Sequence, residues 1–217
     1  MFRRALPVLA LTLGLVGACS ASPDTSGPLP RGTDLTGSAA EALKNLNGTR
    51  FRLGLSGMIP GLPIRSIEGT ANRDGTGSGR ADVQESAEKF SDVTYTVAGR
   101  VATVSGKNAP PRTLAVPAQY DPATLLGPDK GLRRALLAAT GVTTEAKEPL
   151  NKVDAYRLTG KLAGPVISQL IPGITADVDV KFWVREAEPH DLMRIWMQVP
   201  PYKPSEGAVM LELSLSP

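Results

Sequence analysis

Apolar and polar residues alternate along several short segments of the 217-residue chain. A period of two residues is that of a strand with one buried face. Two segments show it most clearly, with apolar side chains at Phe51, Leu53 and Leu55, and at Val93, Tyr95 and Val97. The same pattern predicts further strands at about 67–71, 101–104, 178–185, 192–199 and 208–215. Residues 72–79 are predicted to form a Gly-rich hairpin loop.

Other segments have the helical period. The clearest helix covers about 129–139, where apolar residues recur at the i, i+3, i+4 and i+7 positions. A first helix is predicted from Ser38, because Ser38 and Glu41 have the spacing of a capping box. A third begins near Gly164, with Pro165 well placed in its first turn. Residues 110–122 look like a loop, followed by a helical turn at 125–126.

This order of elements predicts an α+β fold. Consecutive strands joined by short turns favour an antiparallel meander. Because one face of the sheet is apolar and the other polar, the helices should cover a single face. The folded part is expected to be one domain, from about 38 to 217.

The N-terminus has the features of an export signal. Residues 1–18 have Arg3 and Arg4 near their start, followed by an apolar run that is too short to span a bilayer comfortably. The run ends in Val-Gly-Ala-Cys, which resembles the bacterial lipobox and marks Cys19, the single cysteine, for acylation. Two acyl chains would hold the protein stably on a membrane. Residues 19–37 are predicted to be the lipidated cysteine and a flexible tether.

Composition narrows the function classes. One cysteine rules out an internal disulfide framework and zinc sites built on cysteine pairs, and one histidine leaves little room for a multi-histidine metal centre. Without Arg3 and Arg4, 22 basic residues face 21 acidic ones, so the mature chain is close to neutral. The calculated isoelectric point of about 9.1 is therefore no sign of nucleic-acid binding.

The sequence contains no motif that supports a catalytic or cofactor-binding site. The Gly-rich run at Gly75 lacks the Lys-Ser/Thr of a P-loop, and His190 lies in a predicted turn with no nucleophile to pair with. Asp177 and Asp179 are expected to share a strand face towards solvent. Leu137 is expected to be exposed beside Arg133 and Arg134, either as an isolated leucine or as a basic and apolar rim that touches a membrane. No catalytic residue, metal or cofactor is expected.

Several motifs together have a familiar pattern. They are Ile-Pro-Gly-Leu-Pro-Ile at 59–64, Tyr-Asp-Pro at 120–122, Leu-Leu-Gly-Pro-Asp-Lys-Gly-Leu at 125–132, Leu-Thr-Gly-Lys at 158–161 and Val-Lys-Phe-Trp-Val at 180–184. With the lipobox, they resemble the mycobacterial LppX/LprA/LprF/LprG lipoprotein family over about residues 37–215. The stretch 106–118 departs from the family pattern, because it lacks an aromatic-bearing strand before Tyr-Asp-Pro.

The resemblance implies a strongly curved antiparallel sheet, or half-open barrel, with helices packed on its concave face around an apolar cavity. It also implies a non-enzymatic lipoprotein, exported and anchored to the outer face of the plasma membrane. Such a protein binds multi-acylated lipids or glycolipids and carries them across the cell envelope, with a membrane lipid transporter as a further partner and no nucleic acid.

We expect apolar residues of the sheet and helices to line this cavity. The substitution Leu136→Trp is expected to block the cavity without unfolding the chain. The predicted lining consists of Phe51, Leu53, Leu55, Val93, Tyr95, Val97, Leu125, Leu126, Leu132, Leu136, Val166 and Leu170. Ordinary core packing is the competing interpretation of each residue. The competing function is a non-carrier surface lipoprotein that acts as a scaffold or interaction module.

Overall fold

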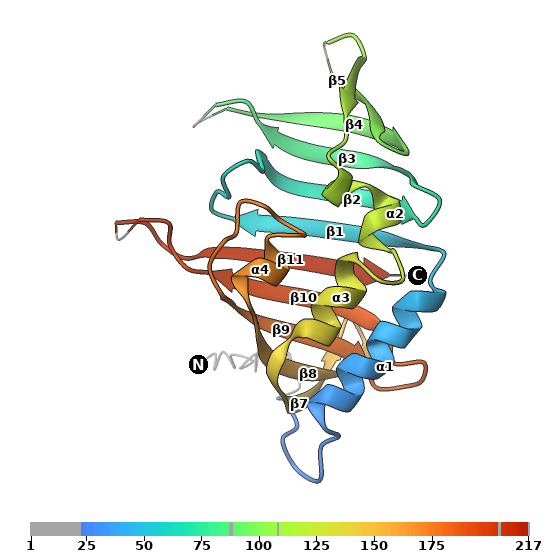
Figure 1. Ribbon diagram of the computed structural model, residues 1–217, viewed down its shortest axis with the longest axis vertical. Coiled ribbons are helices and arrows are strands. Elements are labelled where there is room, and N and C mark those ends of the chain that lie inside the picture. Colours follow the sequence, from blue (N-terminus) through green and yellow to red (C-terminus); the bar gives the residue numbers. More distant parts are fainter. Residues whose placement is uncertain (1–22, 87–88, 108, 204, 217) are drawn as a thin grey trace, which may run out of the picture.

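The computed structural model describes residues 23–86, 89–107, 109–203 and 205–216. Its main feature is one antiparallel sheet of eleven strands in the order β6-β5-β4-β3-β2-β1-β11-β10-β9-β8-β7 (Figure 1). The strands are β1 (Gly48–Ser56), β2 (Ile64–Asn72), β3 (Thr76–Gln84), β4 (Phe90–Ala98), β5 (Val101–Gly106), β6 (Arg112–Ala115), β7 (Thr140–Leu150), β8 (Val153–Leu162), β9 (Val178–Arg185), β10 (Leu192–Val199) and β11 (Val209–Ser216).

The sheet consists of two meanders joined at the middle. Strands β1 to β6 form one and β7 to β11 the other, and β1 pairs with β11. At this junction Phe51, Leu53 and Leu55 lie opposite Leu215, Leu213 and Leu211. Two alternating segments that are far apart in the sequence thereby place their apolar residues on the same face.

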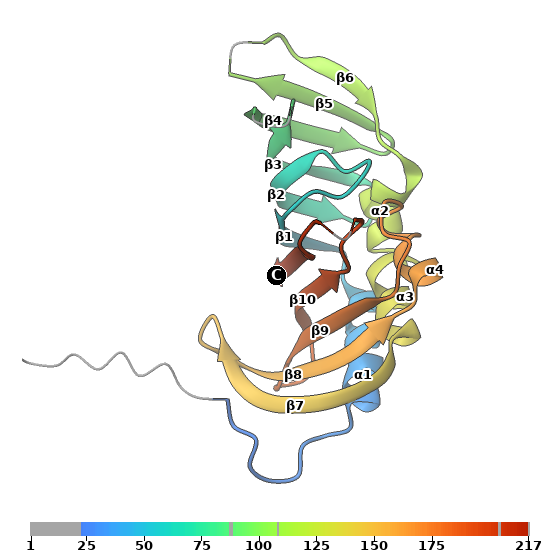
Figure 2. The ribbon, with the colours of Figure 1, turned by 90° about the vertical axis from the view of Figure 1, so that its left-hand side faces the viewer.

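The helices all lie on one face of the sheet (Figure 2). They are α1 (Gly32–Asn45), α2 (Pro122–Leu125), α3 (Gly131–Ala138) and α4 (Gly164–Ile167), with a 3-10 turn η1 (Ala118–Tyr120) before α2. We call the face that carries the helices the inner face, and the opposite side the outer face. The predicted fold class, an open and curved antiparallel sheet with helices on one side, is confirmed. No helix among these residues is long and apolar enough to cross a membrane.

The solid core lies between the helices and the half of the sheet formed by β8 to β11. Phe182 and Ile195 are fully buried there, and Ala39, Ala40 and Leu43 of α1 pack into the same cluster. On the outer face, charged side chains pair between β7 and β8: Arg157 contacts Glu145 at 2.7 Å and Glu148 at 2.6 Å. This half is therefore apolar and filled on one side, and polar on the other.

Several sequence predictions need correction. Helix α1 begins at Gly32 and not at Ser38, its N-cap residue Arg31 makes no side-chain capping bond, and the proposed capping box is wrong. Asp24 also bridges β7, since backbone hydrogen bonds of 2.7 and 2.8 Å join it to Lys147. The ordered part thus starts well before residue 38. The lipobox, Cys19 and the signal segment lie outside the described residues.

Two predicted loops turn out to contain strands. Most of the predicted 72–79 loop belongs to β2 and β3, and residues 112–115 of the predicted 110–122 loop form the edge strand β6. Strands β7 and β8 were not predicted. The helix at about 129–139 is confirmed as α3, and the helix with Pro165 in its first turn is confirmed as the shorter α4.

Candidate ligand-binding site

The inner face continues past the core onto β2 to β5 as an apolar surface. Strand pairing aligns Leu53, Ile67, Ala81 and Val93 in one row across β1 to β4. The adjacent row runs from Phe51 through Gly69 and Gly79 to Tyr95. The second row therefore has glycine on both β2 and β3 between large side chains on β1 and β4, and in the first row Ala81 on β3 is the small residue.

Helices cover the two halves of this face unequally. Helix α1 packs on β7, β9, β10 and α3, whereas the short α2 is the one described helix with more than isolated contacts to β2 and β3. In the described part of the chain, no helix makes more than isolated contacts with β4, β5 or β6. The chain from β6 to α2 also descends along this face (Figures 1 and 2). Val93, Tyr95 and Val97 stay half-exposed and outside the buried cluster.

The hydroxyl group of Tyr95 is a polar group at this otherwise apolar surface. Its side chain extends across β3, and its hydroxyl donates a long hydrogen bond of 3.4 Å to the carbonyl oxygen of Glu68. Burial raises the pKa of Tyr95 to about 12, and the Glu68 carboxylate adds to the rise. The hydroxyl is therefore neutral at any physiological pH, and a ligand on this surface meets no formal charge from it.

A small opening lies between α2, α3 and α4. It has a volume of about 130 Å³, and its lining combines apolar side chains with two exposed cations, Lys130 and Arg134. The full lining is Thr124, Lys130, Gly131, Arg134, Ala135, Val166, Gln169 and Leu170. Apolar and cationic groups in one opening are suited to a lipid with an anionic headgroup.

The twelve predicted lining residues divide by burial. All lie on the inner face, on the helices that cover it or in the residues just after these helices, but five are buried and belong to the packed core: Leu55, Leu126, Leu132, Leu136 and Leu170. Seven are half-exposed and remain candidates for ligand contact: Phe51, Leu53, Val93, Tyr95, Val97, Leu125 and Val166. The sequence missed the small residues of β2 and β3, although their spacing at every second position was the available signal.

The burial of Leu136 changes the expected effect of its substitution. Its side chain is only 1% exposed and lies in the core cluster. We expect Leu136→Trp to overpack the helix–sheet interface and to lower the free energy of unfolding by about 1–3 kcal/mol. Urea unfolding monitored by circular dichroism measures this decrease in the free energy of unfolding. An unchanged unfolding midpoint would instead reveal free volume beside Leu136.

The other residues singled out by sequence have structural roles. His190 lies in the β9–β10 turn, where its Nδ1 lies 3.0 Å from the carbonyl oxygen of Arg185. Asp177 accepts a hydrogen bond from the Gly164 amide at 2.9 Å, while Asp179 pairs with Lys161 at 2.5 Å. These two aspartates do not form a common site. No cluster of potential metal ligands occurs among the described residues.

Leu137 is exposed, as predicted, with 52% of its surface accessible. Arg133 does not join it in a basic rim, because its guanidinium pairs with Glu41 at 2.7 Å and is largely covered. Arg134 remains exposed on the same helix.

Comparison with known proteins places this architecture among lipoproteins. The family model described as LppX_LprAFG lipoprotein matches residues 32–215. Two curated relatives are the lipoarabinomannan carrier proteins LprG of Mycobacterium leprae, 28% identical over 98% of this chain and 91% of its own, and of Mycolicibacterium smegmatis, 27% identical over 89% and 85%.

Two solved structures of lipoproteins also resemble the fold of this chain. LprF from Mycobacterium bovis superposes with a TM-score of 0.72 at 16% identity, covering 88% of this chain and 94% of its own. LppX from Mycobacterium tuberculosis gives a TM-score of 0.65 at 16% identity, covering 85% and 92%. At such low identity these two likenesses establish the fold alone.

Proposed function

Because the chain belongs to the LppX_LprAFG lipoprotein family, we propose that it binds multi-acylated lipids or glycolipids and carries them across the cell envelope. The observation that supports this most is the half-exposed apolar surface on β1 to β4, which the helices leave uncovered beyond β3. Relatives are named as carriers of lipoarabinomannan, and that name supports a lipid or glycolipid cargo.

Acyl chains fit this surface chemically. Each methylene group transferred from water to an apolar surface contributes about 0.8 kcal/mol. Three sixteen-carbon chains would gain roughly 36 kcal/mol on that basis, far above the ceiling of about 18–21 kcal/mol for real affinities. Water is therefore the wrong reference state. The donor is a membrane, transfer between two apolar phases is nearly neutral, and the protein serves by sheltering chains while they cross water.

The proposed anchor would hold the domain beside its membrane. Cys19 lies outside the described residues, but Asp24 is already attached to β7. The five residues that follow Cys19, up to and including Asp24, span at most about 18 Å when fully extended. A diacylglyceryl group on Cys19 would therefore keep the sheet close to the outer face of the plasma membrane, where lipid is taken up. A membrane lipid transporter at that surface would be the natural supplier.

A transfer assay tests the proposal. A chain beginning at Ser20, which contains every described residue, is mixed with donor vesicles carrying a fluorescent diacyl lipid and with unlabelled acceptor vesicles. We expect the transfer rate to rise in proportion to protein concentration, because the protein carries lipid through water. A rate that stays at the spontaneous value at all concentrations would contradict carriage and favour a scaffold role.

A further inference from the structure

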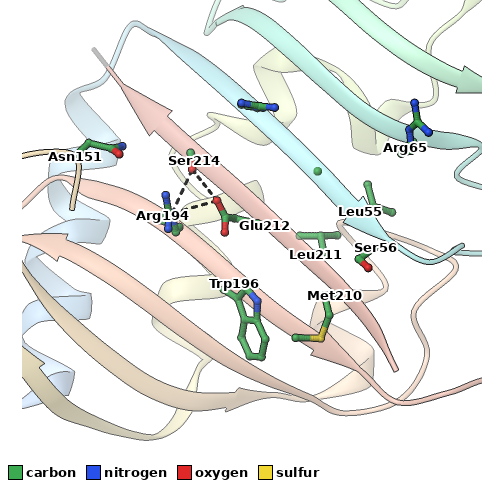
Figure 3. Close-up of a pocket in the computed structure, with 12 residues that line it drawn as sticks. Leu55, Ser56, Arg65, Asn151, Arg194, Trp196, Met210, Leu211, Glu212 and Ser214 are labelled. Atoms are coloured by element: carbon green, nitrogen blue, oxygen red, sulfur yellow. Dashed lines mark hydrogen bonds and ion pairs between the residues drawn. The ribbon is translucent and has the colours of Figure 1, made fainter. Parts of the chain in front are cut away.

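The outer face of the sheet has a separate pocket of about 560 Å³ (Figure 3). It lies over β1, β11 and β10, with Asn151 of the β7–β8 turn and Arg65 of β2 on opposite sides (Figure 3). Its lining is Arg52, Gly54, Leu55, Ser56, Arg65, Asn151, Arg194, Trp196, Met210, Leu211, Glu212 and Ser214. The volume is within the range of small-molecule sites, and the pocket is on the side of the sheet away from the proposed lipid surface.

The charges of this pocket leave one cation without a partner. Arg65 pairs with Asp82, and Arg194 lies 3.3 Å from Glu212. Arg52 forms no ion pair or hydrogen bond with any residue that the structure describes, and its exposed guanidinium is part of the lining. A guanidinium presents several N–H donors in a fixed plane, which matches a phosphate or a carboxylate. The guanidinium of Arg52 is therefore available to one anionic group.

Other hydrogen-bonding groups in the lining are also unused within the described chain. Trp196 is half-buried, and its indole N–H has no acceptor among the described residues, whereas the neighbouring Trp183 donates to Glu148 at 2.6 Å. The side chains of Asn151 and Ser56 likewise have no protein partner among the described residues. An indole with a free N–H offers both a flat apolar face and a donor. A ligand with an apolar face and hydroxyl groups would use both.

We propose that this pocket binds an anionic sugar, that is, a sugar or cyclitol ring with a phosphate or carboxylate group. The anion pairs with Arg52, the C–H face of the ring packs on Trp196, and a ring hydroxyl bonds to Asn151. This chemistry is shared by free sugar phosphates and by the phosphorylated headgroups of glycolipids. The inference does not depend on lipid carriage, because the two surfaces lie on opposite faces of the sheet.

The test measures binding by calorimetry. The full chain is purified in a polyoxyethylene detergent, which contains no sugar that could compete, and is titrated with glucose 6-phosphate, glucose and inorganic phosphate. We expect glucose 6-phosphate to bind more tightly than either of the other two. Arg52→Gln should weaken it about tenfold, because a charge-assisted hydrogen bond is lost. Quenching of tryptophan fluorescence should accompany binding.

Arg50→Gln is the matched control. Arg50 lies two positions away on the same strand and the same outer face, and it is not part of the pocket. It should change the affinity less than twofold. Equal loss in both variants, equal affinity for inorganic phosphate and the sugar phosphate, or no binding at all would each overturn the proposal.

A further titration distinguishes the two sources of ligand. Glycerophosphoinositol has the phosphodiester headgroup of a phospholipid without its acyl chains. Binding tighter than that of glucose 6-phosphate, and dependent on Arg52, assigns the pocket to a lipid headgroup. Weaker binding assigns it to a free sugar phosphate.

Discussion

A carboxylate at position 93 is expected to reduce lipid uptake at least tenfold while the chain stays folded. Val93 is half-exposed on the inner face of β4, between the small neighbours Ala81 and Gly106, and it is not part of the buried cluster. In the free protein, Val93→Asp would therefore place its charge in water. Bound acyl chains would remove that water, and an unpaired buried charge costs several kcal/mol. Uptake of a labelled lipid from vesicles measures the loss.

Thr94→Asp is the matched control. It adds the same charge one residue away on the same strand, but Thr94 is exposed on the outer face, opposite Arg80. Lipid uptake by this variant should equal that of the parent chain, and both variants should melt within a few degrees of it. If Val93→Asp also took up lipid normally, acyl chains would not occupy β4.

Phe182→Ala should have the largest effect on stability. Phe182 is the largest of the fully buried side chains, with 0% exposure, and lies on β9 beneath the helices. Truncating a buried phenylalanine typically lowers the free energy of unfolding by about 3–5 kcal/mol, since a cavity remains. Urea unfolding measures the change. At a temperature where the variant is still folded, lipid uptake should be unchanged.

Val93→Ala provides the comparison on the uncovered half. It removes apolar atoms from a half-exposed side chain, so it should cost less than about 1 kcal/mol. Similar losses at positions 93 and 182 would mean that both halves of the sheet are equally packed. The division into a solid half and an uncovered half would then be wrong.

Alternation along the chain was sufficient to predict which side chains share a face. The pattern at 51–55 and that at 209–215 turned out to be cross-strand partners. The pattern failed for β7 and β8, because their pairing shifts register at two places and their outer side chains form an ion-pair network. A strand with charged residues and bulges has no simple period of two.

Alternation does not report which apolar residues a helix covers. Leu55 and Val97 occupy equivalent positions in similar patterns, yet Leu55 is buried and Val97 is half-exposed. The difference comes from the path of the helices over the sheet, which depends on long-range packing. The start of α1 was missed for a related reason: Arg31 precedes the helix and no capping side chain marks its first turn.

Native mass spectrometry, followed by organic extraction, tests lipid carriage most directly. The chain from Ser20 onwards is made in its own host, in the parent form and with Val93→Asp or Thr94→Asp. We predict that the parent and Thr94→Asp proteins carry an extractable acylated lipid, and that Val93→Asp does not. Parent protein found only at its calculated mass, with no uptake of labelled lipid from vesicles, would contradict the account.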